Sequence, residues 1–570
     1  MVRARESSLI LLAAVVGVAA GLVVAFMGAG VDFLHVLFFG LQPGQRLSGR
    51  ITLDPRVAFT VPFLGGIAFG LLTAAIAKWR PRREVDPIEA NALRGGRMSL
   101  IGSLIVAIET VWSSGVGASV GLEAGYTQLA AGVASRIGQA FRMRRGDLRI
   151  LVGCGAAAGI AGAFGAPLAG AFYGFELVIG SYSAASLAPV GIAALVGYFV
   201  ARSLAPVQLG IVAAQAGTIL ARDLIGAAAL GLLAALVGIA MMRGVALCEA
   251  SFTFLRVRPA LRPALGGLVV GMLATVSPQV MSSGHGALHL SGMLDLPLSF
   301  VALIFGLKIL ASIVSLGTGF RGGLFFASLL IGALGGQLFA TLLNAGWPST
   351  YFDPNAYAVI GMSALSASVI GGPLTMSFIA LESTGNLWLT TIVLVAVIIS
   401  TQITRELFGY SFATWRLHLR GETIRSAADV GWIRDLTVRR LMRPDVTTVN
   451  ADMAIEEFRH KFPLGSKTRV IAVDAVGHYA GLVLVADAHA ADVDITGGLH
   501  GILHHRVVVL HPDMNIQETI AVFDAAEAES LAVVEASGEN RPIGVLTEAH
   551  AMRRYAEESE RQRRDMIGDN

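Results

Sequence analysis

Charged residues are scarce in this chain. Only 15% of its 570 residues are charged, whereas soluble proteins usually carry about 25%. The shortage is uneven, because residues 322–404 contain no Lys or Arg, while the sequence after Arg420 has the mixed charge of a soluble protein. Hydrophobic residues make up 54% of the chain. This distribution excludes a soluble fold for most of the chain and predicts a membrane protein with a soluble C-terminal part.

Cysteines and metal-binding patterns are scarce as well. The two cysteines, Cys154 and Cys248, both lie in apolar runs, where a small core residue is more frequent than a disulfide or a metal ligand. His285 and His289 have helical spacing but no carboxylate beside them, which is a weak metal signal. The sequence has no phosphate-binding loop and no nucleophile within a motif. We therefore expect no metal site, no required cofactor and no enzymatic activity.

Long apolar runs are abundant instead, and Leu9–Phe26, Phe59–Ala77 and Leu224–Met242 approach bilayer length. We interpret the first run as a membrane helix rather than a signal peptide, because more membrane segments follow it. Many runs are broken by Pro or by some of the 67 glycines. Broken helices are tolerated in lipid where they line a cavity or pack inside protein. Channels and secondary transporters use such half-helix ends to build ion sites.

Three short patterns recur in the same order at an offset of about 200 residues, which indicates an internal repeat. The matching segments are residues 64–72 and 265–273, 117–122 and 319–324, and 167–176 and 373–382. Two homologous halves around a midplane site are a common transporter design. If the helices that follow Gly121 and Gly323 face each other with their N-termini, their N–H groups form an anion site. The alternative is that these glycines only allow close helix packing.

Three segments carry a resemblance to a known family. Residues 121–128 read GLEAGYTQ, residues 153–170 read GCGAAAGIAGAFGAPLAG, and residues 319–325 read GFRGGLF. They resemble the GREGP motif with its following Gln, the GAAAGLAAAFNAPLAG run and the GxFxP motif of the CLC family of voltage-gated-type chloride channels and proton/chloride exchangers. The resemblance covers about residues 60–420 and implies a mainly α membrane protein, built as a two-repeat (inverted) bundle of many broken helices. It also implies a homodimer with one pore per subunit.

The resemblance implies a role for Glu123. In the family, the ionised glutamate of this motif competes with anions for the pore, and the protonated glutamate swings aside. A carboxylate inside a membrane segment is a functional candidate on physical grounds too, and at a helix N-terminus it is a tethered anion. The alternative is a carboxylate that only stabilises its helix. The anion-pathway residues that the resemblance implies around it are Gly121, Leu122, Ala124, Gly323, Leu324 and Phe325.

Two departures from the family pattern concern anion coordination. Glu84 stands where the family's GSGIP motif has its coordinating serine, and Ala413 takes the place of the coordinating tyrosine. Tyr410, one helical turn before Ala413, is a candidate substitute. Losing two hydroxyl donors predicts a weakened or reshaped central site. Arg321, just ahead of the second Gly-rich helix start, could attract anions, pair with Glu123 or extend to an interface.

The residue after Glu176 bears on the transport mode. Proton-coupled family members generally have a second, inner glutamate there, whereas this chain has Leu177. Because leucine cannot carry a proton, we expect passive conduction of chloride or a similar small anion, gated by Glu123. The alternative is a proton-coupled exchanger with Glu176 as a substitute relay. A CBS-regulated divalent-cation transporter is less supported, because the Lys/Arg-free region holds only Asp353 and Glu382 as carboxylates.

The C-terminal part resembles a tandem pair of CBS domains. Residues 441–456 and 480–487 match the start and end of one copy, and residues 507–516 and 543–550 match those of a second. In many proteins the cleft of such a pair binds adenine nucleotides. Asp487 and Thr547 stand in the nucleotide-contacting positions, but Leu484 and His550 replace their usual companions. The alternative is a scaffold that helps dimerisation.

The expected organisation follows from these matches. A membrane unit spans residues 1–425, with repeats at about 1–210 and 211–425. CBS domains follow at residues 434–490 and 500–556, and a charged tail at 557–570. Arg clusters near residues 80–83, 142–149 and 256–262 predict cytoplasmic loops by the positive-inside rule. We expect a homodimer in a bacterial inner (plasma) membrane, with the CBS domains in the cytoplasm and no nucleic-acid partner.

Overall fold

A computed structural model describes residues 2–80, 84–204, 221–293, 297–418, 436–491, 493, 498–535 and 540–567. The chain forms two compact units, Met1–Asp429 and Val430–Asn570. The first unit is entirely helical where it is described, and the second combines short strands with helices. The predicted mainly α fold with a small α+β region at its end is confirmed.

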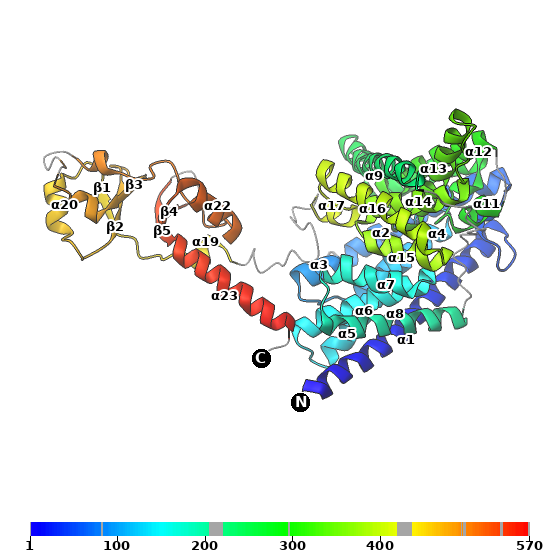
Figure 1. Ribbon diagram of the computed structural model, residues 1–570, viewed down its shortest axis with the longest axis horizontal. Coiled ribbons are helices and arrows are strands. Elements are labelled where there is room, and N and C mark those ends of the chain that lie inside the picture. Colours follow the sequence, from blue (N-terminus) through cyan, green and yellow to red (C-terminus); the bar gives the residue numbers. More distant parts are fainter. Residues whose placement is uncertain are drawn as a thin grey trace. The chain divides into compact units, whose positions relative to one another are not determined.

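The membrane unit contains long and short helices (Figure 1). Within the described ranges, nine helices are long and apolar enough to cross a bilayer, which makes the chain an integral membrane protein. The helices in chain order are α1 Val2–Phe39, α2 Pro55–Trp79, α3 Pro87–Leu93, α4 Leu100–Gly115, α5 Glu123–Ala140, α6 Arg145–Phe164, α7 Pro167–Tyr173, α8 Ala184–Leu204, α9 Asp223–Phe254, α10 Arg262–Val276, α11 His285–Met293, α12 Leu298–Gly317, α13 Phe325–Gly346, α14 Pro354–Ile370, α15 Pro373–Thr384, α16 Leu387–Leu407 and α17 Phe412–His418.

Reciprocal contacts show how the two sequence repeats are arranged. The amide of Ser119 donates to Ser315 Oγ at 2.9 Å, and the amide of Arg321 donates to Ser113 Oγ at 3.0 Å. Arg321 lies one repeat after Ser119, and Ser113 lies one repeat before Ser315. The second bond is therefore the equivalent of the first with the two halves exchanged. Such exchanged pairs arise when two similar halves are related by a two-fold axis. The repeat found in the sequence is therefore a repeat of structure.

The glycines of the first repeated pattern pack helices. A side chain at Gly66 of α2 would collide with the carbonyl of Pro263, and one at Gly267 of α10 would collide with the carbonyl of Pro62. Each helix thus presents a glycine to the backbone of the other. Small residues of this kind let membrane helices approach closely. These two glycines therefore serve the close packing of α2 against α10.

Two matching breaks interrupt the helices in the last third of each repeat. Gly165 after α6 and Gly371 after α14 have φ of 66° and 85°, left-handed values that favour glycine. Pro167 and Pro373 then open α7 and α15, where a missing N–H costs nothing. One π-helical turn, Gly174–Ile179, continues α7. The breaks create short helices whose N-termini lie inside the unit and need hydrogen-bond acceptors.

The C-terminal unit contains two copies of one β-hairpin with flanking helices (Figure 1). In the first copy, β1 pairs parallel with β2, and β2 pairs antiparallel with β3; in the second, β4 pairs antiparallel with β5. The backbones of Leu482 and His504 exchange hydrogen bonds of 2.9 and 2.8 Å. The elements are α19 Val438–Leu441, β1 Thr448–Asn450, α20 Ile455–Lys461, β2 Arg469–Val473, β3 Tyr479–Leu484, α21 Val485–Ala488, α22 Ile516–Ala526, β4 Ser530–Val534, β5 Pro542–Thr547 and α23 Glu548–Ile567.

Candidate functional site

Two helix N-termini meet in the interior of the membrane unit. The segments that lead into α5 and α13 run antiparallel and form a two-residue bridge. The amide of Gly121 donates to the carbonyl of Gly323 at 3.0 Å, and the amide of Gly323 donates back at 3.2 Å. The Gly-rich starts that stand far apart in the sequence are thus side by side. Their positive dipole ends and unpaired N–H groups favour an anion here.

The carboxylate of Glu123 occupies this position. Glu123 is only 6% exposed, and its Oε1 accepts a hydrogen bond of 2.6 Å from the amide of Phe325, the first residue of α13. Its Oε2 has no hydrogen-bond partner among the described residues. A side chain at Gly121 or Gly323 would collide with this carboxylate. The two glycines therefore make room for an anion that α5 itself supplies to the N-terminus of α13.

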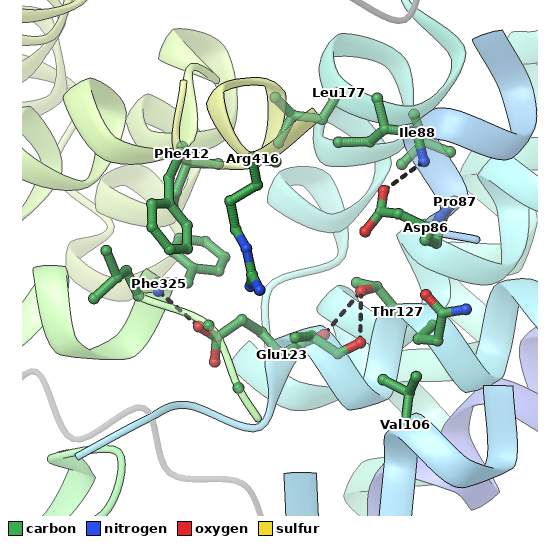
Figure 2. A pocket seen from close by; sticks show the side chains of 18 of the residues that line it. Asp86, Pro87, Ile88, Val106, Glu123, Thr127, Leu177, Phe325, Phe412 and Arg416 are labelled. Carbon is green, nitrogen blue, oxygen red and sulfur yellow. Dashed lines mark hydrogen bonds between the residues drawn. The ribbon is translucent and has the colours of Figure 1, made fainter. Parts of the chain in front are cut away.

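A cavity of about 170 Å³ adjoins Glu123 (Figure 2). Its walls come from the starts of α3, α5 and α13, from the π-helical turn after α7, and from α4, α14 and α17. Of the predicted pathway residues, those in its lining are Glu123, Ala124, Gly323, Leu324 and Phe325. Gly121 and Leu122 lie directly before α5, where Gly121 forms the bridge and Leu122 is buried. The structure thus gathers these residues at one place.

Tyr410 is not among the residues that line this cavity. Its ring lies against Trp415, with 5.7 Å between the centroids. Ala413, which has no hydrogen-bonding side chain, does line the cavity. Sequence reasoning missed Arg416, which lies one helical turn after Ala413 and also lines it. The signal was available as a basic residue in a membrane segment, but helical spacing alone does not show which side chain meets the cavity.

Three more charged residues of the cavity lining, Arg321, Glu84 and Asp86, have interaction partners. Arg321 Nε lies 3.4 Å from Glu109 Oε2, so this arginine pairs with a glutamate of α4. Glu84 Oε1 lies 3.7 Å from Arg80 Nε. Asp86 caps α3 by accepting a 2.8 Å bond from the amide of Ile88. Pairing with Glu123 was one of the three roles considered for Arg321. The structure shows Arg321 paired with Glu109 instead.

Glu176 caps a helix. Its Oε1 accepts from the amide of Leu374 at 2.9 Å, and its Oε2 accepts from the amide and hydroxyl of Thr375 at 2.9 and 2.7 Å. These donors belong to the first turn of α15. Glu382 does the same for α7, accepting from the amides of Leu168 and Ala169 at 2.8 and 2.9 Å. The two carboxylates thus satisfy the helix starts that the Gly-Pro breaks created.

The residue that follows Glu176 in the chain forms part of the cavity wall. Leu177 lines the cavity, whereas Glu176 does not. The carboxylates in the lining are Glu84, Asp86 and Glu123. A proton that crosses from the cavity to Glu123 would have to use one of these groups or water, because leucine cannot accept it.

The predicted nucleotide contacts of the C-terminal unit are engaged with neighbours. Asp487 Oδ2 lies 2.6 Å from His504 Nε2. Thr547 Oγ1 accepts a 3.3 Å bond from the amide of His550. Burial and then the nearby guanidinium groups, that of Arg553 first, lower the pKa of His550. This imidazole is therefore neutral at pH 7 and does not replace the negative charge of the aspartate that other CBS domains have there.

Two protein-family models match this chain, one in each unit. A family model described as voltage gated chloride channel matches residues 65–405, and a CBS domain model matches residues 499–557. The voltage-gated ClC-type chloride channel ClcB of Escherichia coli strain SMS-3-5 / SECEC is 31% identical over 410 residues, which cover 70% of this chain and 96% of that protein. The ClcB protein of Escherichia coli O157:H7 matches to the same extent.

Solved structures share the fold. A slow cyanobacterial Cl⁻/H⁺ antiporter superposes with a TM-score of 0.63 at 22% identity and covers 72% of this chain and 97% of its own. A CLC-type fluoride/proton antiporter has a TM-score of 0.57 at 23% identity, over 70% and 96% of the two chains. A eukaryotic CLC transporter has a TM-score of 0.60 at 18% identity, over 95% and 97%. At these identities, the likeness concerns the fold.

Proposed function

Since the chain belongs to the CLC family of chloride channels and transporters, we propose that its membrane unit conducts chloride or a similar small anion passively and that Glu123 gates it. The family transports anions and does not consist of enzymes. The observation that carries the proposal is the 2.6 Å hydrogen bond from the amide of Phe325 to the Glu123 carboxylate. The chain's own anion occupies the donors that a transported anion needs.

The gating follows from charge. An ionised Glu123 satisfies the N-terminus of α13 with a charge-assisted bond, so an external anion must displace it. Protonation removes the charge and weakens that bond, which lets an anion compete. We therefore expect faster anion flux at lower pH, where the protonated carboxylate is more populated.

Passive transport is favoured by the surroundings of Leu177 and Glu176. Leu177 lines the cavity at the place where coupled relatives have a proton carrier, and Glu176 is held by three hydrogen bonds at the start of α15. The alternative is proton-coupled exchange. It is favoured by the likeness to two antiporter structures and by the two further carboxylates in the cavity lining, Glu84 and Asp86.

Liposomes that contain the purified protein, monitored with a chloride electrode and a pH electrode together, test this proposal. We expect chloride efflux without proton movement in a fixed ratio, and no efflux from protein-free liposomes. Proton uptake in constant proportion to chloride would establish the exchanger instead and make Glu84 and Asp86 the next residues to replace. The absence of any anion flux would overturn anion conduction as the function.

For the assembly, we propose a homodimer in a bacterial plasma membrane with the C-terminal unit in the cytoplasm. The basic residues near the ends of α2, α5 and α9 support this orientation under the positive-inside rule. Each subunit supplies a complete site around Glu123, since the two helix N-termini belong to one chain.

We propose that the C-terminal unit serves as a scaffold, with adenine nucleotide binding as the second candidate. The 2.6 Å hydrogen bond between Asp487 and His504 favours the scaffold, because a ribose would have to displace the histidine. We expect ATP, ADP and AMP to leave the anion flux of the full-length protein unchanged, with heats in isothermal titration no larger than those of dilution. Saturable binding that the Asp487→Asn variant loses would establish the nucleotide site instead.

A further inference from the structure

We propose that Lys308 is a positioning residue of the gate: it holds the loop of residues 277–284 against the starts of α5 and α13, and so keeps the Glu123 carboxylate on the N-terminus of α13. Lys308 is not among the residues that line the cavity, so it acts through the loop and not on the anion. The proposal deepens the proposed gating by Glu123 and rests on it.

Lys308 is a buried basic residue in the middle of a membrane helix. Its exposed fraction is 0%, and α12 is one of the helices long enough to cross a bilayer. Its Nζ donates to the carbonyls of Val280 at 3.0 Å and Ser282 at 2.8 Å. Among the described residues, no carboxylate forms an ion pair with it. An ionisable side chain at such a place is costly and marks a functional position, and here its bonds go to one loop.

The loop of residues 277–284, between α10 and α11, has a backbone conformation that needs support. Ser282 has φ of 53°, a left-handed value that is uncommon for a residue with a side chain. Gly284 also has a left-handed φ, of 94°. The two carbonyls that Lys308 binds lie on either side of Met281, so the ammonium group bridges the bend of the loop. Two bonds from a charged donor stabilise this conformation.

The loop in turn holds the segment that leads into α5. The amide of Ser282 donates to the carbonyl of Gly117 at 3.2 Å, and Ser282 Oγ lies 2.8 Å from Ser114 Oγ. Gly117 has φ of 87°, and a side chain there would meet Met281 of the loop. Glu123, the first residue of α5, follows Gly117 by six residues. The position of the loop therefore bears on the position of the gate.

Two more side chains of α12 hold the same segment before α5. Ser315 Oγ accepts a bond of 2.9 Å from the amide of Ser119, and Ser312 Oγ lies 3.0 Å from Ser119 Oγ. Lys308, Ser312 and Ser315 are spaced by four and three residues, which places them on one face of the helix. All three are fully buried. This face of α12 thus supports the entry to α5 directly through its serines and, through Lys308, by way of the loop.

The loop also leads to the start of α13. His285, the residue directly after the loop, packs its ring on Phe326, with 3.6 Å between the ring centroids. Phe326 follows Phe325, whose amide donates the 2.6 Å bond to Glu123. The loop and the residue after it therefore contact both helix starts that form the anion site. Because Lys308 binds the loop at two carbonyls, it stabilises both contacts at once.

Replacement of Lys308 by methionine removes this support without a large change of shape. Methionine has a similar length but cannot donate a hydrogen bond, so the carbonyls of Val280 and Ser282 lose their donor. The loop then relaxes, and the starts of α5 and α13 are held less firmly together. Because hydrogen bonds weaken steeply when their geometry worsens, the bond that keeps the ionised Glu123 in place weakens, and an anion displaces it more readily.

The test measures chloride efflux from liposomes at neutral pH for Lys308→Met in two backgrounds, the wild type and Glu123→Gln. In the wild-type background we expect Lys308→Met to accelerate efflux by about threefold or more, as is usual for coupled residues of one hydrogen-bond network. In the Glu123→Gln background we expect no further acceleration, because the gating charge is already absent. Lys78→Met, which changes an exposed lysine in the last turn of α2, is the matched control and should behave like the wild type.

Size-exclusion profiles in detergent show which variants are folded. A folded Lys308→Met protein with slower or unchanged efflux, or with the same acceleration in both backgrounds, overturns the positioning role, because the lysine then does not act through the gate. If Lys308→Met does not fold, Ser282→Ala, which removes the side-chain bond between the loop and Ser114, is compared in the same two backgrounds, and an unchanged rate overturns the proposal.

Failure of the proposed function gives a different result. A wild type that moves no chloride overturns anion conduction itself. A conducting wild type whose Glu123→Gln variant has the same rate overturns Glu123 as the gate, and the role of Lys308 with it. Acceleration by Lys308→Met in the wild-type background alone supports both the gate and its positioning residue.

Discussion

Glu123→Gln is expected to open the anion pathway at neutral pH and to make anion flux independent of pH. Glutamine has nearly the same shape as glutamate but carries no charge, so its bond to the Phe325 amide is an ordinary neutral one. The change from a charge-assisted to a neutral hydrogen bond is about 1–2 kcal/mol, which predicts roughly tenfold faster chloride efflux near neutral pH. Chloride efflux from liposomes at neutral and acidic pH measures both effects.

The sign of the pH effect follows from the same contact. In the wild type, acid protonates the carboxylate that lies on the N-terminus of α13, so efflux should rise as the pH falls. In Glu123→Gln no proton can be added there, and the rates at the two pH values should agree. Glu249→Gln, which changes an exposed glutamate of α9, serves as the control and should behave like the wild type. A Glu123→Gln protein with the wild-type pH dependence would mean that another group gates the pathway.

Glu176→Leu and Glu382→Leu are each expected to lower the stability of the membrane unit by about 2–4 kcal/mol, because each leaves two helix-start N–H groups without an acceptor. The two carboxylates occupy equivalent places in the two repeats, at the starts of α15 and α7. We therefore expect similar losses for the two variants. Thermal unfolding in detergent, followed by the loss of monodisperse protein, measures them.

The control for this experiment is Glu406→Leu. Glu406 accepts one exposed side-chain bond of 2.8 Å from Gln402 near the end of α16, and its removal should change stability by no more than about 0.5 kcal/mol. The experiment also bears on the transport mode. A Glu176→Leu protein with wild-type stability and altered proton movement would favour the relay role for Glu176 over the cap.

Much of this architecture was predictable from local sequence. The apolar runs, the absence of Lys and Arg in residues 322–404 and the repeated glycine patterns predicted a membrane protein of two halves. Glu123 was identifiable because a carboxylate is costly in a membrane segment and here stands at a helix start. These signals are local, since hydrophobicity, turn formation and helix initiation depend on neighbours in the chain.

The functions of other residues depended on partners that lie far away in sequence. Glu176 matched a family position in the sequence. Its role as hydrogen-bond acceptor for α15 depends on the amides of Leu374 and Thr375, which lie 198 and 199 residues further along the chain. Tyr410 was predicted to enter the pathway from its spacing to Ala413, yet its ring lies against Trp415. Helical periodicity identifies the residues that share a face, but it does not show what lies opposite that face.

The sequence by itself determined the membrane location, the internal repeat, the family resemblance and the candidate gate, because each depends on composition or on short motifs. Only the tertiary structure decided that the Glu123 carboxylate lies on the amide of Phe325, 202 residues away, and that Arg416 enters the cavity beside it. The physical reason is that an anion site made of helix ends exists only where two distant chain segments meet, and long-range packing sets that meeting point.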